Sequence, residues 1–141
     1  MATTNGTQMA KVLATDGFTK ARSNEVTGKV RVFRETVTMA SQAAGDIIRV
    51  GQLPANSKFL YGVITASATL GATATIKIGT TASDAAFRAA ATHTVVVPTL
   101  FGTVTGLGLS FTAATDVILT VGAAALPSSG TLYIEIFYSV E

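Results

Sequence analysis

Short runs of alternating apolar and polar residues, each ended by a turn signal, dominate this chain from residue 29 onward. A period of two places successive side chains on opposite faces of a strand, whereas a helix needs apolar residues three and four apart. The runs recur about every ten residues, a spacing typical of antiparallel sandwiches and not of strands alternating with helices. The pattern predicts an all-β fold: an antiparallel β-sandwich of jelly-roll type with seven to eight strands.

Three runs alternate most regularly, at residues 73–78, 116–121 and 131–140. In each run the larger apolar side chains share one face, which we expect to cover the core. The residues predicted to face inward from these runs are Ala74, Ile76, Ile78, Val117, Leu119, Val121, Leu132, Ile134, Ile136, Tyr138 and Val140.

The remaining runs are less regular. Residues 30–39 change phase midway, which predicts a β-bulge in that strand. Residues 58–65 are expected to place Phe59, Tyr61 and Val63 together on one face. Residues 47–50 predict a short strand, in a segment that Leu53-Pro54 ends. Three valines, 95–97, predict another strand before Pro98. Residues 84–91 are the one segment with a helical composition.

The first 28 residues differ from the rest of the chain. They are rich in Thr, Asn and Gly and have no sustained period, which predicts an extended lead-in with one short strand at most. We therefore divide the chain into an N-terminal arm, residues 1–28, and a β-sandwich domain, residues 29–141. Six basic and three acidic residues fall within residues 1–35. The candidate partner contacts on the arm are Lys11, Lys20 and Arg22.

The charge pattern bears on the class of partner. The net charge of the chain is +2, and the basic residues of the arm are too dispersed for a nucleic-acid tail. No apolar run reaches the roughly 18 residues of a membrane-spanning helix. We expect neither nucleic acid nor membrane as a partner.

Nothing in the sequence assembles a catalytic or metal-binding motif. The chain has no Cys and one His, His93, whereas zinc sites take several such ligands and a triad needs a His between a nucleophile and a carboxylate. His93 is therefore expected at the surface or at a strand end. Residues 106–110 lack the lysine and the helix of a phosphate loop. We predict no enzyme activity and no cofactor.

The surface is expected to be poor in charge. Charged residues make up 13% of the chain, about half the share in ordinary soluble domains. Tyr133 and Phe137 fall on the outward face of the last strand. Either they cover a neighbouring loop, or this face is covered by another subunit, and both are candidate partner-binding residues.

Several motifs resemble those of small structural proteins of tailed bacteriophages. Residues 45–63, GDIIRVGQLPANSKFLYGV, resemble a core motif of these proteins, and residues 70–79, LGATATIKIG, are similar to the strand that follows. Residues 115–122 and 130–136 resemble their final hairpin. The size and the basic arm most resemble the jelly-roll cement, or decoration, proteins of short-tailed phages, although residues 55–57 read Ala-Asn-Ser where a Gly is usual.

The resemblance implies a virion protein that binds the outside of the phage head and stabilises the icosahedral capsid by bridging major capsid proteins. It implies the major capsid protein as partner, and self-association in which a dimer is favoured over a trimer. The lack of Cys and of a signal-peptide pattern fits synthesis in the host cytoplasm.

Two alternatives stay open. The same strands would serve another virion component, such as a tail, baseplate or head-fibre module. A carbohydrate-binding β-sandwich is the third reading, which the absence of Trp and the presence of only three Tyr disfavour.

Overall fold

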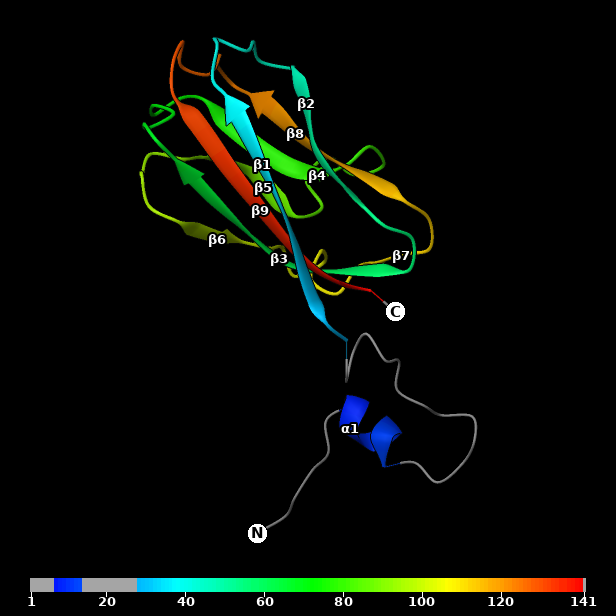
Figure 1. Cartoon of the computed structure of the whole chain (residues 1–141). Helices are drawn as coiled ribbons and strands as arrows, with labels where there is room; N and C mark the ends of the chain where they lie inside the picture. Colours follow the sequence, from blue (N-terminus) through cyan, green and yellow to red (C-terminus); the bar gives the residue numbers. More distant parts are fainter. Residues whose placement is uncertain (1–6, 14–27, 141) are drawn as a thin grey trace.

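The computed structural model describes residues 7–13 and 28–140, which form a β-sandwich with one short helix before it in the sequence (Figure 1). The elements in chain order are α1 (Thr7–Val12), β1 (Val30–Thr38), β2 (Ile47–Leu53), β3 (Ser57–Ala66), β4 (Thr75–Thr80), β5 (Arg88–Thr92), β6 (Thr99–Phe101), β7 (Ser110–Phe111), β8 (Thr115–Gly122) and β9 (Thr131–Val140).

The strands form two sheets, and every described strand pair is antiparallel. Sheet A has the order β1-β9-β3-β6, and β7 also pairs with β3. Sheet B has the order β2-β8-β4-β5. Strands β1 to β4 alternate between the sheets, so the chain crosses repeatedly from one layer to the other (Figure 1). The predicted antiparallel sandwich is confirmed, and the two-residue β7 brings the number of strands to nine.

One apolar core fills the space between the sheets. The predicted inner faces of β4, β8 and β9 are confirmed, since Ile76, Leu119 and Ile134 are fully buried with their same-face neighbours. At the end of β9 the core gives way to half-buried Tyr138 and Val140. The remaining apolar residues of the core come chiefly from β1, β2 and β3 and the loops, namely Val37, Met39, Val50, Leu53, Phe59, Ile64, Ala66, Leu70, Phe87, Phe101 and Leu126.

Strand β3 contains a bulge that the sequence pattern did not predict. Its pairing with β9 shifts between Phe59 and Tyr61, so Leu60 is an extra residue. A bulge reverses the phase of the residues that follow it. Phe59 is therefore buried, whereas Tyr61 is 38% exposed and Ile64 is buried. The prediction that Phe59, Tyr61 and Val63 share a face is wrong.

Strand β1, in contrast, lacks the predicted bulge. Its register on β9 runs without a break from one end to the other. Val30 and Val32 face outward, and Phe33 and Val37 are the residues that face the core. Phe33 packs over β2 at Gly51, where a Cβ atom would lie 2.0 Å from the phenyl ring. The apolar residues at the start of β1 belong to the outer face, so no change of phase is needed.

The predicted helix at residues 84–91 is also wrong. Turns at residues 80–86 lead into β5, and the Phe87 amide donates to the Ile78 carbonyl at 2.9 Å. Phe87 is fully buried and stacks on Phe59 with ring centroids 4.1 Å apart. Burial of this one aromatic ring outweighs the weak helix preference of a segment barely two turns long.

Two further expectations concern residues 95–97 and the N-terminal arm. The valines of residues 95–97 lie in the exposed connection between β5 and β6, so the strand predicted there is absent. Within the predicted arm, residues 7–12 form helix α1 in place of a strand. The rest of the arm, residues 1–6 and 14–27, lies outside the described residues, and the boundary at residue 28 stays a prediction.

Candidate protein-binding face

The face of sheet A that points away from the core is rich in apolar side chains. On β9, Tyr133 and Phe137 both fall on this outer face, and Tyr133 is 48% exposed. Phe137 lies in register between Val32 of β1 and Tyr61 of β3. We call the outward set on β1, β9, β3 and β6 the apolar patch: Val32, Tyr61, Val63, Leu100, Tyr133 and Phe137.

The centre of the apolar patch is an aromatic pair. The rings of Tyr61 and Phe137 stack with centroids 4.5 Å apart and planes 13° apart. Tyr61 reaches this position because the bulge at Leu60 turns it outward. Two rigid, stacked rings present a large apolar surface that loses little conformational entropy on binding.

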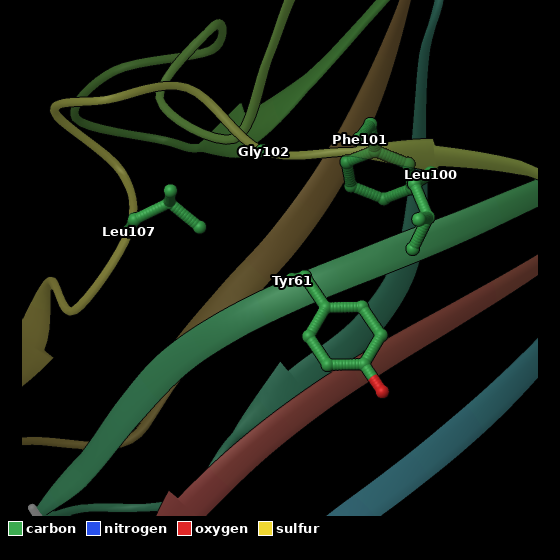
Figure 2. Close-up of a pocket in the computed structure, with 5 residues that line it drawn as sticks. All are labelled: Tyr61, Leu100, Phe101, Gly102 and Leu107. Atoms are coloured by element: carbon green, nitrogen blue, oxygen red, sulfur yellow. The ribbon is translucent and has the colours of Figure 1, made fainter.

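A shallow hollow lies beside this pair, at the edge of sheet A. Its volume is about 520 Å³, and its lining comprises Tyr61, Leu100, Phe101, Gly102 and Leu107. Figure 2 shows Leu107 on the loop after β6, with its side chain directed toward the β3–β6 pair, which carries Tyr61, Leu100 and Phe101. Gly102 directly follows β6. Leu100 is 71% exposed. The hollow extends the apolar patch and has the apolar lining expected of a binding site.

Two glycines hold the hollow in shape. A Cβ atom on Gly62 would lie 2.1 Å from the Phe101 ring, so the absence of a side chain at Gly62 leaves room for this ring against β3. A Cβ atom on Gly102 would lie 2.9 Å from Leu107. Close packing of this kind leaves the hollow little freedom to collapse.

A polar cluster flanks the patch near Tyr133. The Arg34 guanidinium pairs with the Glu135 carboxylate at 2.5 Å, across the β1–β9 pair. A second hollow of about 290 Å³ lies here, and its lining includes Tyr133 and Glu35. Exposed ion pairs contribute little to fold stability, so this pair adds little to the stability of the sheet.

The outer face of sheet B differs from that of sheet A. It carries the ion pairs Arg49–Asp116 and Lys77–Asp84, both at 2.5 Å. Its largest exposed apolar side chain is Ile47, at 64% exposure. The described aromatic residues with exposed rings, Tyr61 and Tyr133, both lie on sheet A. The aromatic surface is therefore confined to one side of the sandwich.

The segments that follow β5 and β6 are also apolar and exposed. Residues 89–115 contain no Asp, Glu, Lys or Arg. Yet Val104 and Leu107 are more than half exposed, as are Val96 and Val97. An uncharged stretch that is also exposed and apolar is unusual for the free surface of a monomer.

The predicted partner contacts are only partly brought together. Tyr133 and Phe137 share the apolar patch. Lys11 lies in α1 and is half-buried, whereas Lys20 and Arg22 lie outside the described residues. Sequence reasoning missed Tyr61 and Leu100. A bulge at Leu60 leaves no local signal in the sequence, but the chargeless stretch around Leu100 is readable from the sequence alone.

His93 follows β5 and is 3% exposed, so it is a strand-end residue but not a surface one. Its Nε2 atom has no hydrogen-bond partner among the described residues. Burial lowers the pKa of His93, and the charge of Arg88 lowers it further. Arg88 itself donates to the carbonyls of Ile76, Ala91 and Thr92, which fastens β5 to β4.

The described residues contain no group of three or more His, Asp or Glu side chains placed to hold a metal ion. No helix in the described part of the chain is long and apolar enough to cross a membrane.

The chain is thus an antiparallel β-sandwich with one aromatic outer face. Comparison with known proteins identifies solved structures that share this fold. No protein-family model and no curated protein matches the chain. Among solved structures, a chain of the cyanophage Pam1 capsid asymmetric unit is 21% identical with a TM-score of 0.70, and the match covers 100% of both chains.

Two further capsid structures match. A chain from the capsid of Ralstonia phage GP4 is 20% identical with a TM-score of 0.68, over 81% of this chain and 86% of that one. A chain from the acid-stable capsid of Helicobacter pylori bacteriophage KHP30 is 10% identical with a TM-score of 0.57, over 81% of this chain and 94% of that one. At these identities the likeness shows a shared fold.

Proposed function

We propose that this chain is a structural protein of a phage virion that binds the outside of the head and stabilises the capsid by bridging major capsid proteins. The observation that carries the proposal is the apolar patch on sheet A, an exposed aromatic face on a domain whose other outer face is charged. Exposed apolar surface of this kind marks an interface with another protein.

The neighbours in structure support the phage assignment. All three matches described above come from phage capsids. The strand order supports a jelly roll: without β7, eight strands divide into two four-stranded sheets with the crossings expected of two Greek keys. A decoration protein needs a self-sufficient sandwich whose outer surface is free to bind.

The proposed binding mode has two parts. The apolar patch docks on the capsid protein, and the arm, with Lys11, Lys20 and Arg22, reaches a neighbouring subunit. Many copies on a fixed lattice raise the total strength of attachment even where each contact is modest. We further propose a homo-oligomer, a dimer ahead of a trimer, made in the host cytoplasm, with no enzyme activity and no binding to nucleic acid or membrane.

The test is reconstitution on shells of the parent phage assembled without this chain. We expect the wild type to bind the outside of such shells and to raise their resistance to heat. Leu100→Asp, on the apolar patch, should bind at least about tenfold more weakly, since it buries an unpaired charge in an interface. The matched control is Ile47→Asp, an equally exposed change on sheet B, which should bind as the wild type does.

Copy number separates the alternatives. A decoration protein should approach the capsid protein in abundance within purified virions, whereas a tail, baseplate or head-fibre module should be present in few copies. A carbohydrate-binding role would appear as glycan binding that is lost in Tyr133→Ala. Equal binding of the Leu100 and Ile47 variants to shells would contradict the assignment of the apolar patch.

A further inference from the structure

The three valines between β5 and β6 have the sequence of a strand but no strand partner. Val95, Val96 and Val97 are 46%, 56% and 56% exposed. Valine is among the residues most favoured in strands and gains from packing on a pleated surface. Three in a row on the surface of a monomer therefore conflict with the local structure they adopt, and such conflicts concentrate at functional sites.

The main chain of this segment is also unpaired. Within residues 28–140, no hydrogen bond reaches the amides of Val95, Val96 or Val97. The carbonyl of Val97 accepts from the Thr99 hydroxyl at 3.1 Å. The flanking residues are anchored, because the His93 carbonyl accepts from the Leu70 amide at 3.0 Å and β6 pairs with β3. The segment is thus exposed, its three amides are free to donate hydrogen bonds, and its two ends are fixed by the neighbouring structure.

Its surroundings indicate the chemistry of what would cover it. The segment lies in the chargeless stretch of residues 89–115. Pro98 restricts Val97 to extended conformations, which is the conformation of a strand. Leu100, three residues on, is part of the apolar patch and of the adjoining hollow. A partner here must therefore supply main-chain hydrogen-bonding groups and an apolar surface, and it must not present charges.

We infer that residues 95–97 form an added strand on an open sheet edge of the capsid protein, next to the surface that the apolar patch covers. This inference rests on the proposed function and names how one segment of the interface is made. In strand addition the main chain supplies affinity, and alternate side chains enter the partner's pockets. The valine segment becomes a strand only in the complex, which accounts for its β-prone sequence in an unpaired loop.

Amide hydrogen exchange on the full chain tests this inference. The amides of Val95–Val97 should exchange fast in the free protein and at least about a hundredfold more slowly when it is bound to shells lacking this chain, since only hydrogen-bonded amides resist exchange. Binding to shells with no change in exchange at these amides would overturn the inference and leave the proposed function intact. Failure of the wild type to bind shells would overturn both.

Single prolines give an independent test. Along an added strand only alternate amides face the partner, so Val95→Pro and Val96→Pro should differ: one should weaken binding about tenfold, the size of one lost hydrogen bond, and the other should weaken it less. The controls Val95→Thr and Val96→Thr keep the amides and should bind nearly as the wild type does. All four should melt as the wild type does.

Two results would count against strand addition. Equal loss from proline and threonine at the same position would mean that the side chains alone make the contact. Slow exchange that appears in concentrated protein without shells would mean that the segment pairs with a second copy of this chain.

Discussion

Tyr61 of β3 and Phe137 of β9 stack on the outside of the sandwich with ring centroids 4.5 Å apart. They are cross-strand partners because Leu60 is an extra residue in β3. If Leu60 were instead paired as an ordinary strand residue, Tyr61 would lie two positions after Phe59, share its face and point into the core. One bulge thus converts a residue from a core position into the centre of the proposed docking face.

Deletion of Leu60 tests the importance of this bulge. The deletion removes only the extra residue, so Phe59 should stay opposite Tyr138 and Tyr61 opposite Phe137 in a regular pairing with β9. Because both rings keep their faces, we expect cooperative unfolding by urea, with a loss of stability far below the roughly 3–5 kcal/mol that removal of a buried phenylalanine costs. Leu60→Ala retains the bulge at a half-buried position and should also cost little. Loss of cooperative unfolding in the deletion variant, with Leu60→Ala unaffected, would contradict the assigned register.

The two faces of β9 should respond oppositely to the same change. Ile136→Asp places a charge at a fully buried position and should abolish cooperative unfolding, since an unpaired buried charge costs several kcal/mol. Tyr133→Asp, at an exposed position between the core residues Leu132 and Ile134, should remain folded. Circular dichroism melting curves measure both. A folded Ile136→Asp variant would mean that the phase of β9 is reversed.

The free energy of unfolding should decrease on acidification, over a pH range that the pKa of His93 determines. Its pKa is lower in the folded protein than the value of 6.5 usual for a free histidine, owing to burial and then to Arg88. As the pH falls below about 6.5, the unfolded chain takes up this proton first. The free energy of unfolding should therefore decrease, by at most about 1.4 kcal/mol per pH unit, until the folded-state pKa is passed.

The control for this pH dependence is His93→Gln, which removes the titrating group. Urea unfolding between pH 7 and pH 5 should show a shallower decline in this variant than in the wild type. Parallel declines in the two proteins would assign the acid sensitivity to other groups.

Removal of the arm should separate folding from attachment. A chain lacking residues 1–28 keeps every described strand, because β1 begins at Val30. We expect an unchanged melting temperature and weaker attachment to shells. The full-length variant with Lys11, Lys20 and Arg22 changed to Ala should attach less tightly at low salt and show a smaller salt dependence. Loss of cooperative unfolding in the truncation would place the arm in the core.

The sequence predicts this fold well where alternation alone decides the structure. In β4 and β9 burial follows the period of two through Ile76 and Ile134, and in β8 the inward Leu119 is buried as predicted, although residues 117–121 are all buried. Prediction from the sequence fails where the local pattern fits two structures equally well and only tertiary contacts decide between them. Phe59 and Tyr61 are equally suited to a core, and only their pairing with β9 separates them.

The remaining failures have the same origin. Residues 84–91 are alanine-rich, yet Phe87 is needed in the core, and its burial beside Phe59 draws the segment into a strand. The valines at 95–97 are β-prone but have no partner strand within the described chain. The candidate face was only half predicted for this reason: Tyr133 and Phe137 follow from alternation, whereas Tyr61 and Leu100 reach it through the bulge and the short edge strand β6.

The most direct test of the central claim is an electron-microscopy map of the parent phage particle. We predict density for this chain on the outside of the head, in many copies, with the face of sheet A that carries Tyr61 and Phe137 against a capsid subunit. A map in which this face is open to solvent, or in which the chain is absent from the head, would contradict the account.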